Sequence, residues 1–264
     1  MKIGVFDSGV GGLTVLHALL RQAPQADYIY LGDTARLPYG SKSQATIARY
    51  AVSSAHFLVE EQGAEFLVIA CNTASALALD AIKGAVSVPV LGVVETGANA
   101  ARAASASGDV LVIATDATVQ SHAYSAACRE RGLRTYEKAC PLLVPLVEEG
   151  WITHPVTQEV LRIYLSELKQ EAGAMQMSPD TLVLGCTHYP LLRDQIAHIV
   201  PDLKVIDSAC VTAEQVASTI HDKKATGNGT RRFFATDSIE KFRAMGTRFL
   251  GEAIDGVTLV DLGG

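Results

Sequence analysis

Short apolar runs alternate with longer segments of helical periodicity along the whole of the 264-residue chain. The runs are nearly continuous instead of alternating with polar residues, which is typical of parallel strands covered by helices on both faces. This pattern predicts an α/β fold. Strands are predicted at residues 2–8, 27–33, 64–70, 88–95, 108–115, 133–140, 180–185, 203–208, 231–238 and 257–262. Helices are predicted at residues 11–24, 43–63, 73–85, 117–132, 153–173, 190–201, 213–223 and 239–251.

The order of the predicted elements contains a weak internal repeat. The segment IGVFDSGVGG corresponds to VLVIATDATV, and VIACNT corresponds to VLGCTH. This indicates two similar lobes, each a mostly parallel sheet flanked by helices, with the active site in the cleft between them. We expect a first domain of residues 1–97 plus 208–264 and a second of residues 98–207, with hinges near 95–101 and 207–211.

Composition and charge exclude several classes of protein. Hydrophobic residues make up 48% and charged residues 19%, as in an ordinary globular protein and unlike a disordered chain. The net charge of −6 argues against nucleic acid as a partner, and the basic segment 222–232 reads as a solvated loop. No apolar stretch reaches the roughly 18 residues of a membrane span. The first apolar run ends at Asp7 without a signal-peptide pattern, so we expect a cytoplasmic protein.

The cysteines favour reduced thiols over disulfides. Their number is odd and the chain is not small, so free thiols are the default. No CxxC pair is present, and nothing nearby completes a metal site around Cys186 and His188. The sequence therefore predicts no metal. The five cysteines are Cys71, Cys128, Cys140, Cys186 and Cys210.

Small polar residues follow four of the predicted strands, in FDSGVGG, ACNTAS, ATDAT and GCTHYP. In open parallel sheets, ligands bind beyond the carboxyl ends of the strands. Each segment precedes a predicted helix, whose first turn offers unpaired N–H groups and the positive end of the helix dipole. None of the four contains Lys or Arg. We therefore expect a small ligand with carboxylates.

Cys71 and Cys186 occupy the same point of two similar segments. A helix N-terminus favours the thiolate, so we expect each thiol to have a pKa below its usual value of about 8.5. Two such thiols on either side of a small ligand suggest that one removes a proton from a carbon while the other returns it from the far face, inverting the centre. The alternative is that both are buried core cysteines, the usual fate of a free thiol.

Three further positions carry candidate partners for these thiols. Asp7 ends the first predicted strand, where it is a candidate to tune a thiol or to cap the following helix. His188 follows Cys186 by two residues and is a candidate proton partner, or else a hydrogen-bonded structural histidine. Glu148 or Glu149 is a candidate to point into the cleft, although spacing alone favours exposure to solvent.

The glycines at residues 9–12 allow a second interpretation, a loop that binds the phosphates of a dinucleotide such as NAD. Thr14 stands where GxGxxG requires its third glycine. Asp33 is nevertheless a candidate for the acidic residue that would bind the ribose. Dinucleotide binding is therefore a weaker alternative.

Taken together, DSGVGG, LGD with PYG, ACNTAS, VPLVEEG and GCTHYP resemble the motifs of the glutamate racemases, in the aspartate/glutamate racemase superfamily. The resemblance runs from the N-terminus to about residue 209 and is specific as a set. It implies a two-domain α/β isomerase that interconverts L- and D-glutamate by 1,1-proton transfer, without a cofactor. It further implies that D-glutamate feeds peptidoglycan synthesis, and hence cell wall biogenesis and cell shape. It also allows a homodimer.

The matching motifs imply a role for individual residues. Cys71 and Cys186 would be the acid/base groups on opposite faces, Asp7 would assist Cys71, and His188 and Glu148 would assist Cys186. Asp7, both cysteines and His188 would also contact the substrate. The other implied substrate contacts are Ser8, Tyr39, Gly40, Asn72, Thr73, Thr115, Thr118 and Thr187.

Two other kinds of function remain open at this point. One is a related enzyme, namely a racemase for aspartate or another amino acid, or a decarboxylase that needs only one cysteine as proton donor. The other is a two-lobed protein that binds a small anion without catalysis, which gives no reason for paired thiols.

Overall fold

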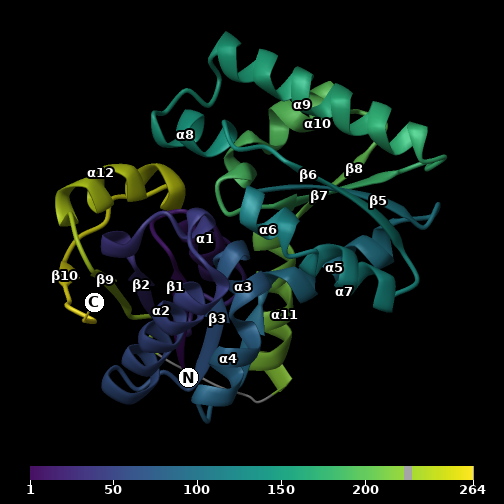
Figure 1. The fold of residues 1–264 in the computed structure, drawn as a ribbon. Coiled ribbons are helices and arrows are strands. Elements are labelled where there is room, and N and C mark those ends of the chain that lie inside the picture. Colours follow the sequence, from purple (N-terminus) through teal and green to yellow (C-terminus); the bar gives the residue numbers. More distant parts are fainter. Residues whose placement is uncertain (223–227, 264) are drawn as a thin grey trace.

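The computed structural model describes residues 1–222 and 228–263, so residues 223–227 of the predicted basic loop lie outside it. The chain forms two lobes, each built on one parallel sheet with helices against it (Figure 1). The predicted α/β class with two mostly parallel sheets is confirmed. Within the described residues, no helix combines the length and apolarity needed to cross a membrane.

The first lobe is built on a six-stranded parallel sheet in the order β10-β9-β2-β1-β3-β4. Asp7 pairs with Gly32 and Phe6 with Ile69, so the carboxyl ends of the central strands lie level. The last two strands return to this sheet because β9 pairs with β2. The strands are β1 (Lys2–Asp7), β2 (Asp27–Gly32), β3 (Phe66–Ile69), β4 (Val90–Gly92), β9 (Arg231–Ala235) and β10 (Val257–Leu259).

The second lobe is built on a four-stranded parallel sheet in the order β6-β5-β7-β8. Its central strands are fully buried, as their continuous apolar sequences predict. Ala114 pairs with Gly185, which places Thr115 and Cys186 at the same edge of the sheet. The strands are β5 (Asp109–Ala114), β6 (Arg134–Ala139), β7 (Thr181–Gly185) and β8 (Lys204–Asp207).

Helices cover both sheets. In the second lobe, α9 and α10 lie on one side of the sheet, and α5 and α7 lie on the other (Figure 1). Short 3₁₀ helices occupy Thr34–Arg36, Tyr39–Ser41 and Tyr189–Leu192. The α-helices are α1 (Leu13–Gln22), α2 (Gln44–His56), α3 (Asn72–Leu77), α4 (Leu79–Ala85), α5 (Val93–Ala104), α6 (Asp116–Gln120), α7 (Ala123–Glu130), α8 (Leu143–Glu148), α9 (Pro155–Ala174), α10 (Arg193–Ile199), α11 (Ser208–Asp222) and α12 (Ile239–Leu250).

The chain crosses between the lobes through two helices, α5 and α11, where hinges at 95–101 and 207–211 were predicted. The predicted strand 88–95 is shorter, because α5 begins at Val93. The buried positions of α5, among them Val93, Gly97 and Ala101, recur at helical spacing. The two crossing helices meet through hydroxyls of Thr96 and Thr212, 2.6 Å apart. The exact domain boundaries stay a prediction.

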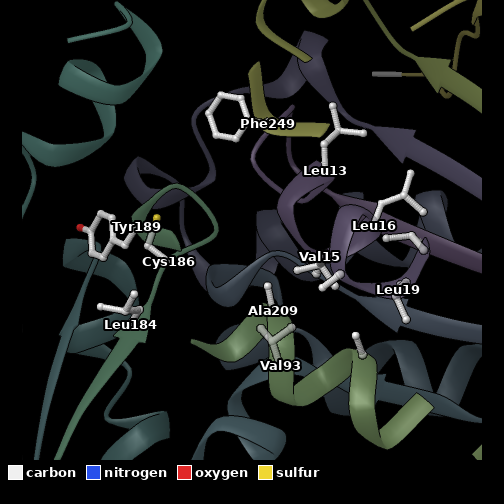
Figure 2. Packing of buried hydrophobic residues seen from close by; sticks show 14 of the residues in the cluster. Leu13, Val15, Leu16, Leu19, Val93, Leu184, Cys186, Tyr189, Ala209 and Phe249 are labelled. Atoms are coloured by element: carbon white, nitrogen blue, oxygen red, sulfur yellow. The ribbon is translucent and has the colours of Figure 1, made fainter. Parts of the chain in front are cut away.

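The largest hydrophobic core runs without interruption from one lobe to the other (Figure 2). Leucines of α1, such as Leu13 and Leu16, share this core with Val93 of α5 and Ala209 of α11. Leu184 of β7 belongs to the same cluster. Burial of each large aliphatic side chain contributes about 1.5–3 kcal/mol. The lobes are therefore fixed together at the crossing helices, next to the ends of the central strands.

Candidate active site

A cavity of about 360 Å³ lies between the lobes, at the carboxyl ends of their central strands. Segments after β1, β2 and β3 form one side, and segments after β5, β6 and β7 form the other. The described residues that border it are Ser8, Leu37, Pro38, Tyr39, Gly40, Ser41, Cys71, Asn72, Thr73, Thr115, Asp116, Pro141, Val144, Pro145, Glu148, Cys186, Thr187 and His188. The cavity thus contains one cysteine from each lobe.

Cys71 follows β3 and caps α3, with its Sγ accepting a 3.4 Å hydrogen bond from the backbone N–H of Ala74. The thiol donates to the Ser8 hydroxyl over 3.4 Å, and the residue is 5% exposed. Burial, and after it the neighbouring Asp7 charge, raise the pKa of Cys71 to about 12. The predicted lowering of this pKa is therefore wrong, because loss of hydration outweighs the short helix and the two hydrogen bonds.

Asp7 ends β1 directly behind Cys71 and does not border the cavity itself. The backbone N–H of Gly9 donates to its Oδ2 over 2.9 Å. Its Oδ1 is buried and has no hydrogen-bond partner among the described residues. Burial raises the pKa of Asp7, although nearby N–H groups and His188 oppose this shift. Gly12 occupies the N-cap of α1, so Asp7 is not the helix cap.

Cys186 follows β7 and begins a chain of three titratable side chains. Its Sγ lies 3.9 Å from Nδ1 of His188, and Nε2 of His188 lies 3.2 Å from Oε1 of Glu148. Burial opposes a charge on His188, but Cys186 and Glu148 outweigh it and raise its pKa to about 10. The hydrogen bond from His188 lowers the pKa of Glu148. Glu149 is exposed, so Glu148 is the glutamate that reaches the site.

The amide of Asn72 supplies an unused donor in the cavity wall. The Tyr124 hydroxyl donates to its Oδ1 over 2.7 Å, which fixes the orientation of the amide. Its buried Nδ2 has no hydrogen-bond partner in the part of the chain that the structure describes. Buried amide donors are almost always paired, so this group is available to an oxygen of a ligand.

Three threonine hydroxyls from two lobes meet beside this amide. Thr73 lies 3.2 Å from Thr115 and 3.3 Å from Thr118, and Thr115 lies 3.0 Å from Thr118. Thr73 and Thr115 border the cavity, while Thr118 lies behind them. Because each hydroxyl donates one hydrogen, rearrangement of this cluster can direct donors towards a ligand.

The glycine loop and Asp33 are engaged in ways that do not suit a dinucleotide. A Cβ on Gly11 would lie 2.3 Å from the Thr187 hydroxyl, so protein atoms cover this face of the loop. Asp33 is fully buried and accepts hydrogen bonds from Tyr39 at 2.6 Å and Thr236 at 3.0 Å. Thr187 and His188 occupy the space beside Gly11, and Asp33 holds the tyrosine of the cavity wall.

The structure brings most of the predicted site residues together. Cys71, Cys186, His188 and Glu148 border the cavity, as do seven of the eight other implied contacts, all except Thr118. The remaining cysteines lie elsewhere, with Cys128 and Cys140 in the core and Cys210 exposed.

Several residues that border the cavity were not predicted from the sequence. Asp116 lies within the quoted segment ATDAT, so its place after a strand was the available signal. Pro38 lies within the quoted motif PYG, and Val144 and Pro145 lie within VPLVEEG, so these motifs were the available signal for them. These additional residues are Leu37, Pro38, Ser41, Asp116, Pro141, Val144 and Pro145.

Comparison with known proteins finds similarity along nearly the whole chain. The family model of Asp/Glu/Hydantoin racemases matches residues 3–216. A glutamate racemase of Koribacter versatilis (strain Ellin345) is 52% identical over 290 aligned positions, which cover 99% of this chain and 98% of that protein.

Two solved structures share the fold. Glutamate racemase from Francisella tularensis, in complex with D-glutamate, superposes with a TM-score of 0.89 at 37% identity and covers 99% of this chain and 97% of that one. Glutamate racemase from Thermus thermophilus, in complex with beta-chloro-D-alanine, gives a TM-score of 0.88 at 44% identity with the same coverage.

Proposed function

Because the chain belongs to the Asp/Glu/Hydantoin racemase family, we propose that it interconverts L-glutamate and D-glutamate through two cysteine bases. It is an isomerase that acts on amino acids, like its known relatives. The observation that carries the two-base proposal is the single cavity bordered by Cys71 of one lobe and Cys186 of the other. An inversion needs an acid and a base on opposite faces of the α-carbon, and each lobe supplies one thiol.

The reaction consists of two proton transfers. A thiolate removes the α-proton, so the Cα–H bond breaks, an S–H bond forms, and the electron pair moves towards the substrate carboxylate. The opposite thiol then donates its proton to the other face of the carbon. Hydrogen-bond donors around the carboxylate stabilise the carbanion most effectively in a site from which water is excluded.

On the first-lobe side, we assign proton transfer to Cys71, with Asp7 and Ser8 assisting. Burial raises the pKa of Cys71 to about 12, so its thiol is protonated at neutral pH. The positive ammonium group of a bound amino acid would lower this pKa, because a nearby opposite charge favours the thiolate. Asp7 lies behind the thiol with a raised pKa, which suits a carboxyl that holds or releases a proton.

On the second-lobe side, we assign proton transfer to Cys186, with His188 and Glu148 assisting. The His188 pKa of about 10 keeps the imidazole charged at neutral pH. Nδ1 of this imidazole lies 3.9 Å from the Cys186 sulfur, which suits a group that exchanges a proton with the thiol. Glu148 in turn holds the far nitrogen of the ring over 3.2 Å.

The described residues that border the cavity include no Lys or Arg. Uncharged hydrogen-bond donors would therefore bind the substrate carboxylates. We assign Asn72, Thr73, Thr115 and Thr187 to this task, because their polar groups border the cavity. Tyr39 and Gly40 would supply the wall and backbone on the first-lobe side, and Thr118 would act through Thr73 and Thr115.

The use of D-glutamate in the cell extends the proposal from the reaction to a biological role. D-Glutamate is a building block of peptidoglycan, so we infer a role in cell wall biogenesis, with the reaction in the cytoplasm. A homodimer stays a prediction.

The experiment is incubation of the purified protein with L-glutamate in heavy water, without pyridoxal phosphate or added metal. Optical rotation and the α-proton NMR signal are followed together. We expect D-glutamate with deuterium at the α-carbon. Absence of both racemisation and exchange, with glutamate and every other amino acid tried, would refute the proposal. Reaction with aspartate alone would favour the aspartate alternative, which shares the two-base chemistry.

A further inference from the structure

The end of α12 connects the first lobe to the Cys186 side of the cavity. In sequence this helix connects β9 to β10, the two strands at one edge of the first sheet (Figure 1). Phe249 in its last turn lies beside His188, with ring centroids 4.9 Å apart and planes at 79°. Phe249 and Cys186 belong to the same buried cluster (Figure 2). The lobe that carries Cys71 therefore contacts the histidine proposed to assist Cys186.

Arg248 makes a second contact across the same junction. Its Nη1 donates to the carbonyl oxygens of Val147 over 3.1 Å and Glu148 over 2.7 Å. These are the last carbonyls of α8, and that of Val147 also accepts from the backbone N–H of Gly150 over 3.0 Å. A cation at a helix C-terminus also interacts favourably with the helix dipole. Arg248 thus fixes the backbone of the glutamate that holds His188.

The contacting turn of α12 is itself anchored to the first lobe. Nδ1 of His17 in α1 lies 2.7 Å from the carbonyl oxygen of Leu250. Gly251 then ends the helix in the left-handed conformation, with φ of 79°. Gly246 packs so closely on α1 that an added Cβ would lie 2.9 Å from Leu13. Arg248 and Phe249 are therefore presented from a fixed support.

We propose that Arg248 and Phe249 are positioning residues, which hold the Glu148–His188 pair in the arrangement that allows Cys186 to transfer protons. This inference rests on the proposed function of Cys186 and His188. Neither Arg248 nor Phe249 is among the described residues that border the cavity, so they act through other groups and not on the substrate.

Positioning matters because the His188 ring interacts through both of its nitrogens. Nδ1 faces Cys186 and Nε2 faces Glu148, so rotation of the ring loses both interactions. Phe249 is 3% exposed and packs edge-to-face on the ring, which restricts rotation and excludes water. Asp7, whose pKa His188 affects, is a further titratable group near the ring. It belongs to the Cys71 side, so loss of Phe249 should affect the two thiols unequally.

The first test compares Phe249→Leu with Phe57→Leu. Phe57 makes a similar edge-to-face contact, with Phe234 at 5.2 Å and 77°. Neither ring borders the cavity, and their buried cluster is the one that contains Cys71, not Cys186. We expect kcat for glutamate to fall about threefold to tenfold in Phe249→Leu, the range that such an aromatic pair contributes, with KM changed less than about twofold. Phe57→Leu should lower the melting temperature without this loss of kcat. Equal kcat in the two variants would refute the inference.

The second measurement distinguishes positioning from general loosening. Deuterium exchange at the α-carbon is followed in heavy water from pure L-glutamate and from pure D-glutamate. In Phe249→Leu, exchange should fall for the enantiomer whose α-proton Cys186 removes. Exchange for the other enantiomer, deprotonated by Cys71, should persist without inversion. Equal losses for both enantiomers would overturn the inference.

Arg248→Met provides an independent variant if Phe249→Leu does not fold. It removes both hydrogen bonds from Nη1 to α8 but keeps a long apolar side chain, and it should produce the same unequal exchange. Arg248→Lys, which keeps a charge and a donor, should restore part of the loss. Racemisation by the unmodified protein tests the proposed function separately. The role of Arg248 and Phe249 is tested only by the ratio of the exchange rate in each variant to that in the unmodified protein.

Discussion

The Tyr124 hydroxyl in the second lobe donates a 2.7 Å hydrogen bond to Asn72 Oδ1 in the first lobe. Both side chains are buried, and the bond leaves the amide nitrogen of Asn72 as the unused donor in the cavity wall. A single hydroxyl on α7 therefore determines which end of the amide is available to a ligand on α3.

We predict that Tyr124→Phe weakens substrate binding. Without the hydroxyl, Asn72 Oδ1 loses its partner and the amide is free to turn its oxygen towards a carboxylate. A neutral hydrogen bond contributes about 0.5–1.5 kcal/mol, so KM should rise about twofold to tenfold with a smaller change in kcat. Steady-state kinetics with both enantiomers measure this. Tyr28→Phe is the matched control, because the Tyr28 hydroxyl binds only backbone carbonyls near the end of α1. A KM that rises equally in both variants would contradict the assignment.

Replacing Cys71 or Cys186 singly should affect proton exchange of different enantiomers. We expect Cys71→Ser and Cys186→Ser each to lower racemisation by about 10³-fold or more, near the range for loss of an acid or base. Each variant keeps one thiol, so it should still exchange the α-proton of one enantiomer, and the two variants should prefer opposite enantiomers. NMR in heavy water records this. Cys210→Ser, at an exposed position outside the cavity, should behave like the unmodified protein. Undiminished racemisation in either cysteine variant would eliminate the two-base mechanism.

The contacts of His188 with Cys186 and Glu148 should make stability depend on pH. The pKa of His188 rises from 6.5 to about 10 in the folded protein. The folded state therefore binds this proton more tightly than the unfolded state, so the stabilisation is complete below pH 6.5 and lost as the pH rises through about 10. The pKa of Glu148 is lowered, so the stabilisation that Glu148 contributes is lost only as the pH falls below the usual range of a glutamate.

His188→Gln tests this dependence. A charge-assisted hydrogen bond contributes about 1.5–3 kcal/mol, and each kcal/mol shifts the melting temperature of a chain of this size by about 2–4 °C. The melting temperature of the variant should be several degrees below that of the unmodified protein near pH 6, and the gap should close above pH 10. Thermal unfolding followed by circular dichroism at a series of pH values measures the gap. A gap that is constant with pH would mean that His188 is not charged in the folded protein.

The strands and both cysteine positions could be predicted from the sequence because they depend on local patterns. A continuous apolar run specifies a buried parallel strand, and the residue after it lies at the ligand-binding edge of the sheet. The helix α5 was missed because Val93 and Val94 continue the apolar run of β4. Only the second lobe, against which α5 packs, distinguishes the helix from a longer strand.

The electrostatics of the site could not be predicted, because they depend on burial produced by distant segments. The helix N-terminus suggested a low pKa for Cys71, but the surrounding residues remove its hydration and raise the pKa to about 12. Spacing alone could not choose between Glu148 and Glu149; the motif resemblance implied Glu148, which reaches His188, 40 residues away in sequence. Phe249 and Arg248 carried no signal at all, since they reach the Cys186 side only after α12 packs on α1.

Gly11 in the glycine loop of the first lobe faces Thr187 and His188 in the Cys186 loop of the second. An added Cβ would lie 2.3 Å from Thr187 Oγ1 and 2.6 Å from the His188 ring. Neither neighbour can move freely, because Thr14 Oγ1 donates to the Thr187 carbonyl over 2.9 Å and Glu148 holds His188. Gly11→Ala should therefore displace the loop that carries Cys186.

We expect Gly11→Ala to lower kcat about 10²-fold, the loss that a misplacement of about 1 Å can cause. Gly84→Ala is the matched control, because a Cβ there meets no atom within 4 Å. It lies within α4, where alanine is favoured over glycine by about 0.5–1 kcal/mol, so this variant should keep its activity and melt at a slightly higher temperature. Racemase assays and thermal unfolding of both variants provide the comparison. Full activity in Gly11→Ala would mean that the two loops can separate without disturbing Cys186, contrary to the fixed arrangement described above.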